Sequence, residues 1–156
     1  MEKQPNTVIL TYYGVDGACA AALALLQFPH AEVRVTSARR VASSLQELAS
    51  GAFTEAHICG VGVYCEWGEL ESALAALSKH GAQVYWHCGR GYLDADRRRL
   101  EPLCTPVFCD AGTNAAGLAR ALGVADSPAA RRLLELARRD PNLPGALPEA
   151  EAAVED

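Results

Sequence analysis

Residues 7–19, TVILTYYGVDGAC, decide the fold class of this 156-residue chain. The stretch begins with a β-branched, apolar run at Thr7–Thr11, which predicts a short buried strand. Two glycines then flank Asp16 in a predicted tight turn, and the small residues of 18–26 predict a helix. A strand, a glycine-bearing loop and a helix N-terminus form the corner that carries the ligand site in open α/β sheets. Asp16 is therefore a candidate metal ligand, water-positioning group or helix cap.

Strand and helix patterns alternate along the chain as far as residue 140. Predicted strands cover 7–11, 31–37, 55–63, 82–86 and 105–109, and predicted helices cover 18–26, 41–50, 66–80, 94–100, 114–122 and a segment beginning at Pro128. This alternation predicts an α/β, three-layer Rossmann-like domain over residues 1–140, with a mostly parallel sheet of about five strands flanked by helices. Residues 141–156, PNLPGALPEAEAAVED, form an acidic, Pro/Ala-rich tail that we expect to be mobile.

The composition is that of an ordinary globular domain without a basic character. The net charge is −5, so no global positive field would attract nucleic acid. No apolar segment approaches the roughly 20 residues needed to cross a bilayer. The opening residues, MEKQPNT, lack the apolar stretch of a secretory signal. We therefore expect a cytoplasmic protein with no membrane association, whose six cysteines are reduced thiols.

Four segments reach the carboxyl ends of the predicted strands, where ligands bind in such sheets. They are Tyr12–Asp16, Cys59–Gly62, His87–Gly91 and Cys109–Thr113. Three of the four carry a cysteine, and one adds a histidine. These side chains have two interpretations: buried thiols that pack as small hydrophobes, or a soft-metal site for zinc. The metal interpretation uses Cys59, His87, Cys88 and Cys109, with Asp16 as a further candidate ligand.

The order and spacing of these segments resemble the DHH phosphoesterase superfamily, which includes single-strand exonucleases, oligoribonucleases and cyclic-dinucleotide phosphodiesterases. TYYGVDGA at 11–18 is similar to the family's first motif, ICGVG at 58–62 to the second and VYWHCGRGY at 84–92 to the third. LLELARRD, which ends at Asp140, is similar to the last. The resemblance covers residues 7–140 and implies the first domain of that family, without the smaller substrate-gripping domain.

Most side chains that bind metal in the first motif of the family are replaced here. Tyr12 stands at the position of the motif's histidine, and Gly14 stands at the position of its first aspartate. Asp16, followed by glycine, matches the motif. The resemblance also places Asp140 at the position of the family's last aspartate.

The second and third motifs are replaced as well. Gly60, or Cys59 one residue earlier, stands at the position of the second motif's aspartate. The Asp-His-His triplet is replaced either by His87-Cys88-Gly89 or by Cys88-Gly89-Arg90, depending on the register. Arg90 lies between glycines and is the candidate for a bidentate contact to a phosphate.

The family's chemistry requires two divalent ions, typically manganese, held by several carboxylates and imidazoles. Asp16 and Asp140 do not supply that set, so we expect no metal cofactor. The resemblance then implies a non-catalytic domain that binds a nucleotide, a phosphate or a protein partner. An alternative is an active phosphoesterase that hydrolyses short oligonucleotides or cyclic dinucleotides through an altered manganese or zinc site near Asp16, His87 and Cys88. A third interpretation is a Rossmann-like or flavodoxin-like module in which the motif matches are accidental.

Overall fold

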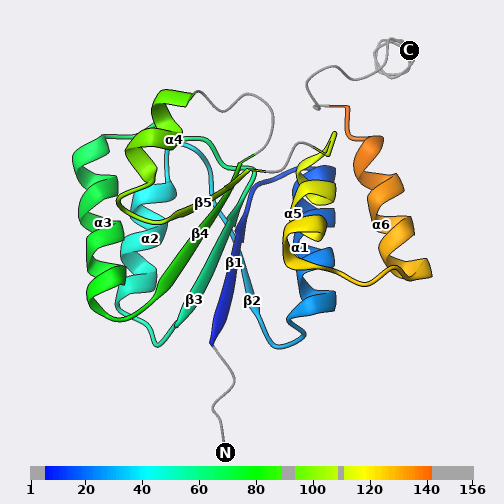
Figure 1. The fold of residues 1–156 in the computed structure, drawn as a ribbon, viewed down its shortest axis with the longest axis horizontal. Coiled ribbons are helices and arrows are strands. Elements are labelled where there is room, and N and C mark those ends of the chain that lie inside the picture. Colours follow the sequence, from blue (N-terminus) through cyan, green and yellow to red (C-terminus); the bar gives the residue numbers. More distant parts are fainter. Residues whose placement is uncertain (1–5, 89–93, 109–110, 142–156) are drawn as a thin grey trace, which may run out of the picture.

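The computed structural model describes residues 6–88, 94–108 and 111–141, and its strands form one sheet with helices on both faces (Figure 1). The strands are β1 (Thr7–Thr11), β2 (Glu32–Val35), β3 (Glu55–Cys59), β4 (Gln83–Cys88) and β5 (Thr105–Phe108). All neighbours are parallel, in the order β2-β1-β3-β4-β5. The predicted α/β class with a parallel sheet of five strands is confirmed, and the strand order is the flavodoxin-like one.

Three helices cover each face of the sheet. On one side lie α1 (Val15–Gln27), α5 (Asn114–Leu122) and α6 (Pro128–Arg138); on the other lie α2 (Val41–Ala49), α3 (Trp67–Lys79) and α4 (Asp94–Leu100) (Figure 1). Buried side chains form one apolar cluster between the sheet and each helical layer. Because both faces are covered, β1 is buried along its whole length, as its continuous apolar run predicts.

The chain leaves β1 toward one face of the sheet and leaves β3 toward the opposite face. Helix α1 follows β1 and packs with α5 and α6, whereas α3 follows β3 and packs with α2. Since β1 and β3 are neighbours, their carboxyl ends form the topological switch point where doubly wound sheets bind ligands. The segments that follow these two strands are therefore the first place to look for a site.

Several predicted boundaries differ from the observed ones. Helix α1 begins at Val15, so Asp16 lies in its first turn rather than in a turn before it. Strand β3 ends at Cys59, because Gly60 adopts φ +67° and turns the chain away from the sheet. The prediction that His87 and Cys88 begin a loop is wrong: both residues belong to β4, which continues because it pairs with β5 as far as Phe108.

The predicted helix ends agree with the structure in the last two helices. Gly123 ends α5 in the left-handed conformation, and the Ser127 hydroxyl accepts a hydrogen bond from the backbone N–H of Ala130 at the start of α6. The five cysteines of the described ranges are free thiols. Within these ranges, the helices are too short or too polar to span a bilayer. Arg90, Cys109 and the predicted tail after residue 141 lie outside the described residues.

Candidate functional site

The carboxylate of Asp16 is the centre of a polar cluster at the carboxyl ends of β1 and β3. Its side chain is fully buried. Oδ2 accepts hydrogen bonds from the phenol of Tyr12 at 2.8 Å and from the backbone N–H of Asn114 at 3.0 Å. Oδ1 accepts one from the backbone N–H of Ala115 at 2.9 Å. Because these two N–H groups begin α5, Asp16 caps α5, and the dipole of that helix stabilises the negative charge. Asp16 thus makes helix N-terminal hydrogen bonds, as predicted, but to α5; its own helix, α1, has no side-chain cap.

Tyr12 joins Asp16 to the side chain of Asn114. The Asn114 amide donates to the Tyr12 hydroxyl at 2.9 Å, and the hydroxyl donates to Asp16. Burial is the largest cause that raises the pKa of Tyr12, and the negative charge of Asp16 raises this pKa further. The phenol therefore stays protonated at neutral pH and acts as a hydrogen-bond donor to the carboxylate.

The ring of Tyr12 occupies the space where a side chain at position 60 would lie, which is free because this residue is glycine. A Cβ atom at position 60 would collide with the Tyr12 ring and would lie 2.9 Å from the side-chain amide of Asn114. No side chain fits at this position while Tyr12 keeps its place. Gly60, one of the two positions that the resemblance assigns to the second motif's aspartate, thus offers only backbone, beside which the ring of Tyr12 lies.

Asp140 completes the cluster from the other end of the chain. Its Oδ2 accepts a hydrogen bond from the backbone N–H of Asp16 at 2.8 Å, and its side chain is buried. A Cβ atom at Gly14 would lie 3.3 Å from the same oxygen, so glycine leaves room for this carboxylate. The structure therefore brings together the predicted cleft residues from the first, second and last motifs. We call Tyr12, Asp16, Asn114, Ala115 and Asp140 the Asp16 cluster.

Among the candidate soft-metal ligands that the structure describes, Cys59 and His87 lie together, whereas the side chain of Cys88 packs apart from them. Cys59 and His87 are register partners on β3 and β4 and share one face of the sheet. Cys88 follows His87 directly and packs in the core on the opposite face, where its thiol donates to the Trp86 carbonyl at 3.4 Å. Burial raises the pKa of Cys88 to about 11 and raises that of Cys59 as well. Both groups are therefore thiols at neutral pH in the metal-free protein, and a metal would have to displace their protons to bind.

The described residues therefore fit neither a manganese pair nor a zinc centre. Both oxygens of Asp16 accept hydrogen bonds from the protein, and Oδ2 of Asp140 accepts one from the backbone of Asp16. Across the described ranges, no three His, Cys, Asp or Glu side chains gather as metal ligands. Dinuclear phosphoester hydrolysis needs oxygen and nitrogen ligands that are free to face the ions, and these carboxylates face backbone N–H groups instead.

At the Asp16 cluster, protein oxygens occupy the N-termini of α1 and α5; helix N-termini of this kind often bind phosphate in α/β proteins. The first three N–H groups of α5 donate to Asp16 and to the Thr113 hydroxyl. In the first turn of α1, the N–H of Asp16 donates to Asp140. A phosphate at this position would have to displace an internal carboxylate.

Three aromatic side chains at the carboxyl edge are exposed instead. Tyr13 follows β1, Tyr64 lies beyond β3 and Phe108 ends β5; they are 89%, 68% and 53% exposed. They are the exposed aromatic residues of the described ranges. The guanidinium of Arg39 stacks over Tyr64 at 5.0 Å from the ring centroid, and that of Arg97 lies over Phe108 at 5.8 Å. We call Tyr13, Tyr64 and Phe108 the edge aromatics.

An open hollow lies beside Tyr64 at the same edge. It has a volume of about 470 Å³ and is lined by Arg39, Val63, Tyr64, Cys65, Glu66 and Glu69. The backbone N–H of Tyr64 donates to the Ala38 carbonyl at 3.0 Å, which ties the segment after β3 to the segment after β2. The hollow thus presents an arginine, an aromatic ring and two carboxylates to solvent.

Two residues of this region were not singled out by the sequence motifs. Asn114 binds both Tyr12 and Asp16. The sequence feature that could have identified it is its place at the start of the helix that follows the fifth predicted strand. His57, on β3, is hydrogen-bonded to the candidate His87 at 2.9 Å. The alternation of β3 and β4 puts both histidines on one face, but the pairing depends on a register that sequence alone does not reveal.

Comparison with known proteins gives little further information. No protein family and no curated protein matches the sequence. Among solved structures, one from Burkholderia pseudomallei is described as a pilus assembly-related protein; it is 17% identical, with 87% of this chain and 95% of that chain covered and a TM-score of 0.44. A likeness at this level carries no argument about function.

Proposed function

We propose that this chain is a DHH-like domain that does not hydrolyse phosphoesters and that acts by binding a protein partner at the carboxyl edge of its sheet. The observation that supports the first part is the Asp16 cluster. The two carboxylates that match the family's motifs, Asp16 and Asp140, accept hydrogen bonds from the protein itself. The ring of Tyr12 covers the position of a third ligand. The flavodoxin-like strand order is shared by other folds, so the proposal depends on this cluster rather than on topology.

The edge aromatics support the second part. Exposed tyrosine and arginine side chains are the residue types that contribute most to protein–protein binding. The net charge of −5 and the carboxylates of Glu66 and Glu69 beside Tyr64 disfavour an extended nucleic-acid strand. A protein surface with apolar and basic groups fits this edge better.

Nucleotide or phosphate binding is a second candidate. It is favoured by the Arg39–Tyr64 pair at the open hollow, because a guanidinium can bind a phosphate and a tyrosine ring can stack on a base. The occupied helix N-termini argue against the same ligand at the Asp16 cluster. The two candidates thus predict binding at different residues.

A turnover assay tests the first part of the proposal. We expect no hydrolysis of a short oligonucleotide or a cyclic dinucleotide at saturating Mn²⁺. Manganese-dependent turnover that Asp16→Ala abolishes would instead establish the active phosphoesterase. Titration of ¹⁵N-labelled protein with mononucleotides and inorganic phosphate separates the two binding candidates: shifts at Arg39 and Tyr64 favour the nucleotide, and their absence favours the protein partner.

Affinity capture with matched variants tests the second part. Proteins captured by the wild-type chain should be lost with a Tyr13→Ser/Tyr64→Ser variant. They should be retained with Leu26→Ser, since Leu26 is also exposed but lies at the far end of α1. Capture that is equal for all three proteins would contradict the assignment of the binding surface to the carboxyl edge.

A further inference from the structure

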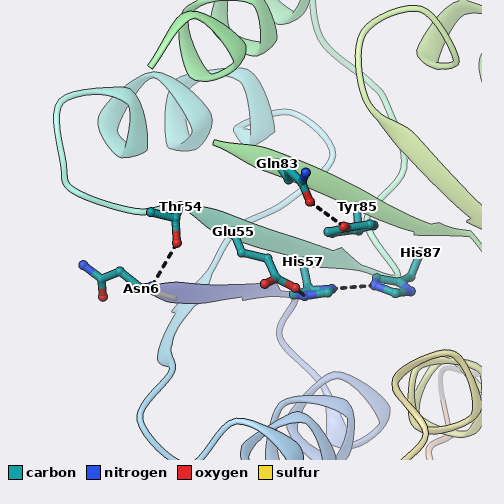
Figure 2. Close-up of polar contacts among 7 residues, drawn as sticks. All are labelled: Asn6, Thr54, Glu55, His57, Gln83, Tyr85 and His87. Atoms are coloured by element: carbon teal, nitrogen blue, oxygen red, sulfur yellow. Dashed lines mark hydrogen bonds and ion pairs between the residues drawn. The ribbon is translucent and has the colours of Figure 1, made fainter. Parts of the chain in front are cut away.

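A chain of hydrogen bonds runs along the sheet face that packs against α1 and α5 (Figure 2). Glu55 and His57 lie on β3, and His87 lies on β4, where it is the register partner of Cys59. Glu55 Oε1 and His57 Nε2 are 2.6 Å apart, and His57 Nδ1 and His87 Nε2 are 2.9 Å apart. The rings of Phe28, Tyr85 and His87 stack on His57 and shield its imidazole from solvent.

The donor and the acceptor of each hydrogen bond in this series follow from the Glu55 carboxylate at one end of it. A carboxylate only accepts, so the proton on His57 sits on Nε2. A neutral imidazole carries one N–H, so His57 Nδ1 accepts and His87 Nε2 must donate. Burial supports this assignment because it lowers the pKa of both histidines. The remaining nitrogen, His87 Nδ1, then presents a lone pair.

His87 Nδ1 is a buried acceptor at the wall of a small cavity. His87 is 7% exposed, and its Nδ1 has no hydrogen-bond partner among the described residues. The cavity has a volume of about 10 Å³ and lies between the sheet and α5; its lining residues are Cys59, His87, Cys88, Val107, Asn114, Gly117 and Leu118. A buried acceptor without a donor is destabilising, and a volume of this size accommodates about one water molecule.

We propose that this cavity binds a single water molecule, which donates a hydrogen bond to His87 Nδ1 and contacts the side chain of Asn114. The water then has three polar neighbours: the imidazole of His87, the amide of Asn114 and the thiol of Cys59. Buried waters typically make about three hydrogen bonds. Asn114 also binds Tyr12, which binds Asp16. The bound water therefore joins the Glu55–His57–His87 hydrogen bonds to the Asp16 cluster, so that one polar network runs along this face of the sheet from the amino end of β3 to the switch point.

Histidine ¹⁵N spectra of the wild-type chain provide the first test. We expect His87 to be protonated on Nε2, with Nδ1 as a hydrogen-bonded acceptor, and to show a nuclear Overhauser effect from a long-lived water to its ring proton. Protonation on Nδ1 would reverse the donors along the chain, and the absence of the water contact would leave the cavity dry. Either result would overturn the proposal.

A double-mutant cycle provides the second test. Gly117 lies in α5 and lines the cavity, so Gly117→Ala adds a methyl group at the cavity wall and leaves less room for the water. We expect this substitution to raise the unfolding equilibrium constant about tenfold more in the wild-type background than in His87→Leu, where the Nδ1 acceptor that the water would satisfy is absent. Gly68→Ala, on an exposed turn of α3 with open space around it, is the control. Equal effects of Gly117→Ala in both backgrounds would count against a bound water.

Discussion

At the scale of single residues, Asp16 connects parts of the chain that are far apart in sequence. Its carboxylate binds the backbone of Asn114, which is 98 residues away, and its own N–H binds Asp140, which is 124 residues away. A buried carboxylate is costly unless its hydrogen bonds are satisfied. Here a phenol and two helix N–H groups satisfy it, so the same contacts stabilise the charge and the tertiary structure.

Asp16→Ala should lower the free energy of unfolding by about 3 kcal/mol or more, because it leaves two buried N–H groups and a phenol without their acceptor. The control is Asp126→Ala, whose exposed carboxylate pairs with Arg131 at 2.8 Å and should change stability by less than about 1 kcal/mol. Urea unfolding measures both values. A loss for Asp16→Ala no larger than that of the control would show that the carboxylate does not cap α5.

The buried histidines make stability depend on pH. Burial lowers the pKa of His87 to about 3 in the folded protein, whereas an unfolded histidine titrates near 6.5. The unfolded chain therefore binds a proton first, and stability is lost as the pH falls below 6.5. Between pH 7 and pH 5, His87 should contribute a loss of about 2 kcal/mol.

Urea unfolding at these two pH values, for the wild type and for His87→Leu, isolates this contribution. The wild type should lose about 2 kcal/mol more than the variant on acidification. An identical pH dependence in the two proteins would mean that His87 is accessible to protons in the folded state.

At the scale of elements, the two sides of the switch point depend on each other. The ring of Tyr12, after β1, occupies the space that the missing side chain of Gly60, after β3, leaves open. A tyrosine at position 12 and a glycine at position 60 are thus compatible as a pair.

Gly60→Ala should destabilise the protein by about 2 to 4 kcal/mol, because it combines backbone strain at positive φ with a collision against Tyr12. Gly123→Ala is a matched control: its φ of +68° is nearly the same as the +67° of Gly60, but open space surrounds it. It should cost about 1 kcal/mol. In a Tyr12→Ala background, the cost of Gly60→Ala should fall by the part that the Tyr12 ring contributes, and the close approach to Asn114 remains. An undiminished cost would contradict the coupling.

The elements themselves were largely predictable from the sequence, whereas the contacts at the site were not. Patterns such as the β-branched run of β1 and the caps Gly123 and Ser127 are local, and the structure agrees with them. The extension of β4 through Cys88 depends on pairing with β5, which is a tertiary effect. The capping of α5 by Asp16 and the His57–His87 hydrogen bond also depend on sheet register, so neither contact could be predicted from local sequence patterns.

At the scale of the whole molecule, the sheet brings three motif regions to one edge. The polar side chains of these regions hydrogen-bond there to other groups of the protein. The carboxylates bind backbone, the tyrosine covers the glycine, and the aromatic groups that reach solvent lie around this cluster. The described residues at this edge do not supply the free carboxylates and imidazoles of a dinuclear centre. Under the proposed function, we expect the protein to bind a partner at its carboxyl edge without hydrolysing phosphoesters there.

Manganese binding, measured by electron paramagnetic resonance, tests this central claim most directly. Aqueous Mn²⁺ gives a sharp six-line spectrum that disappears when the ion binds to protein, so a titration counts bound ions. We predict that the signal grows in proportion to added Mn²⁺, as it does with Asp16→Asn and with buffer. Loss of the signal until two equivalents have been added, reversed in Asp16→Asn, would contradict the account.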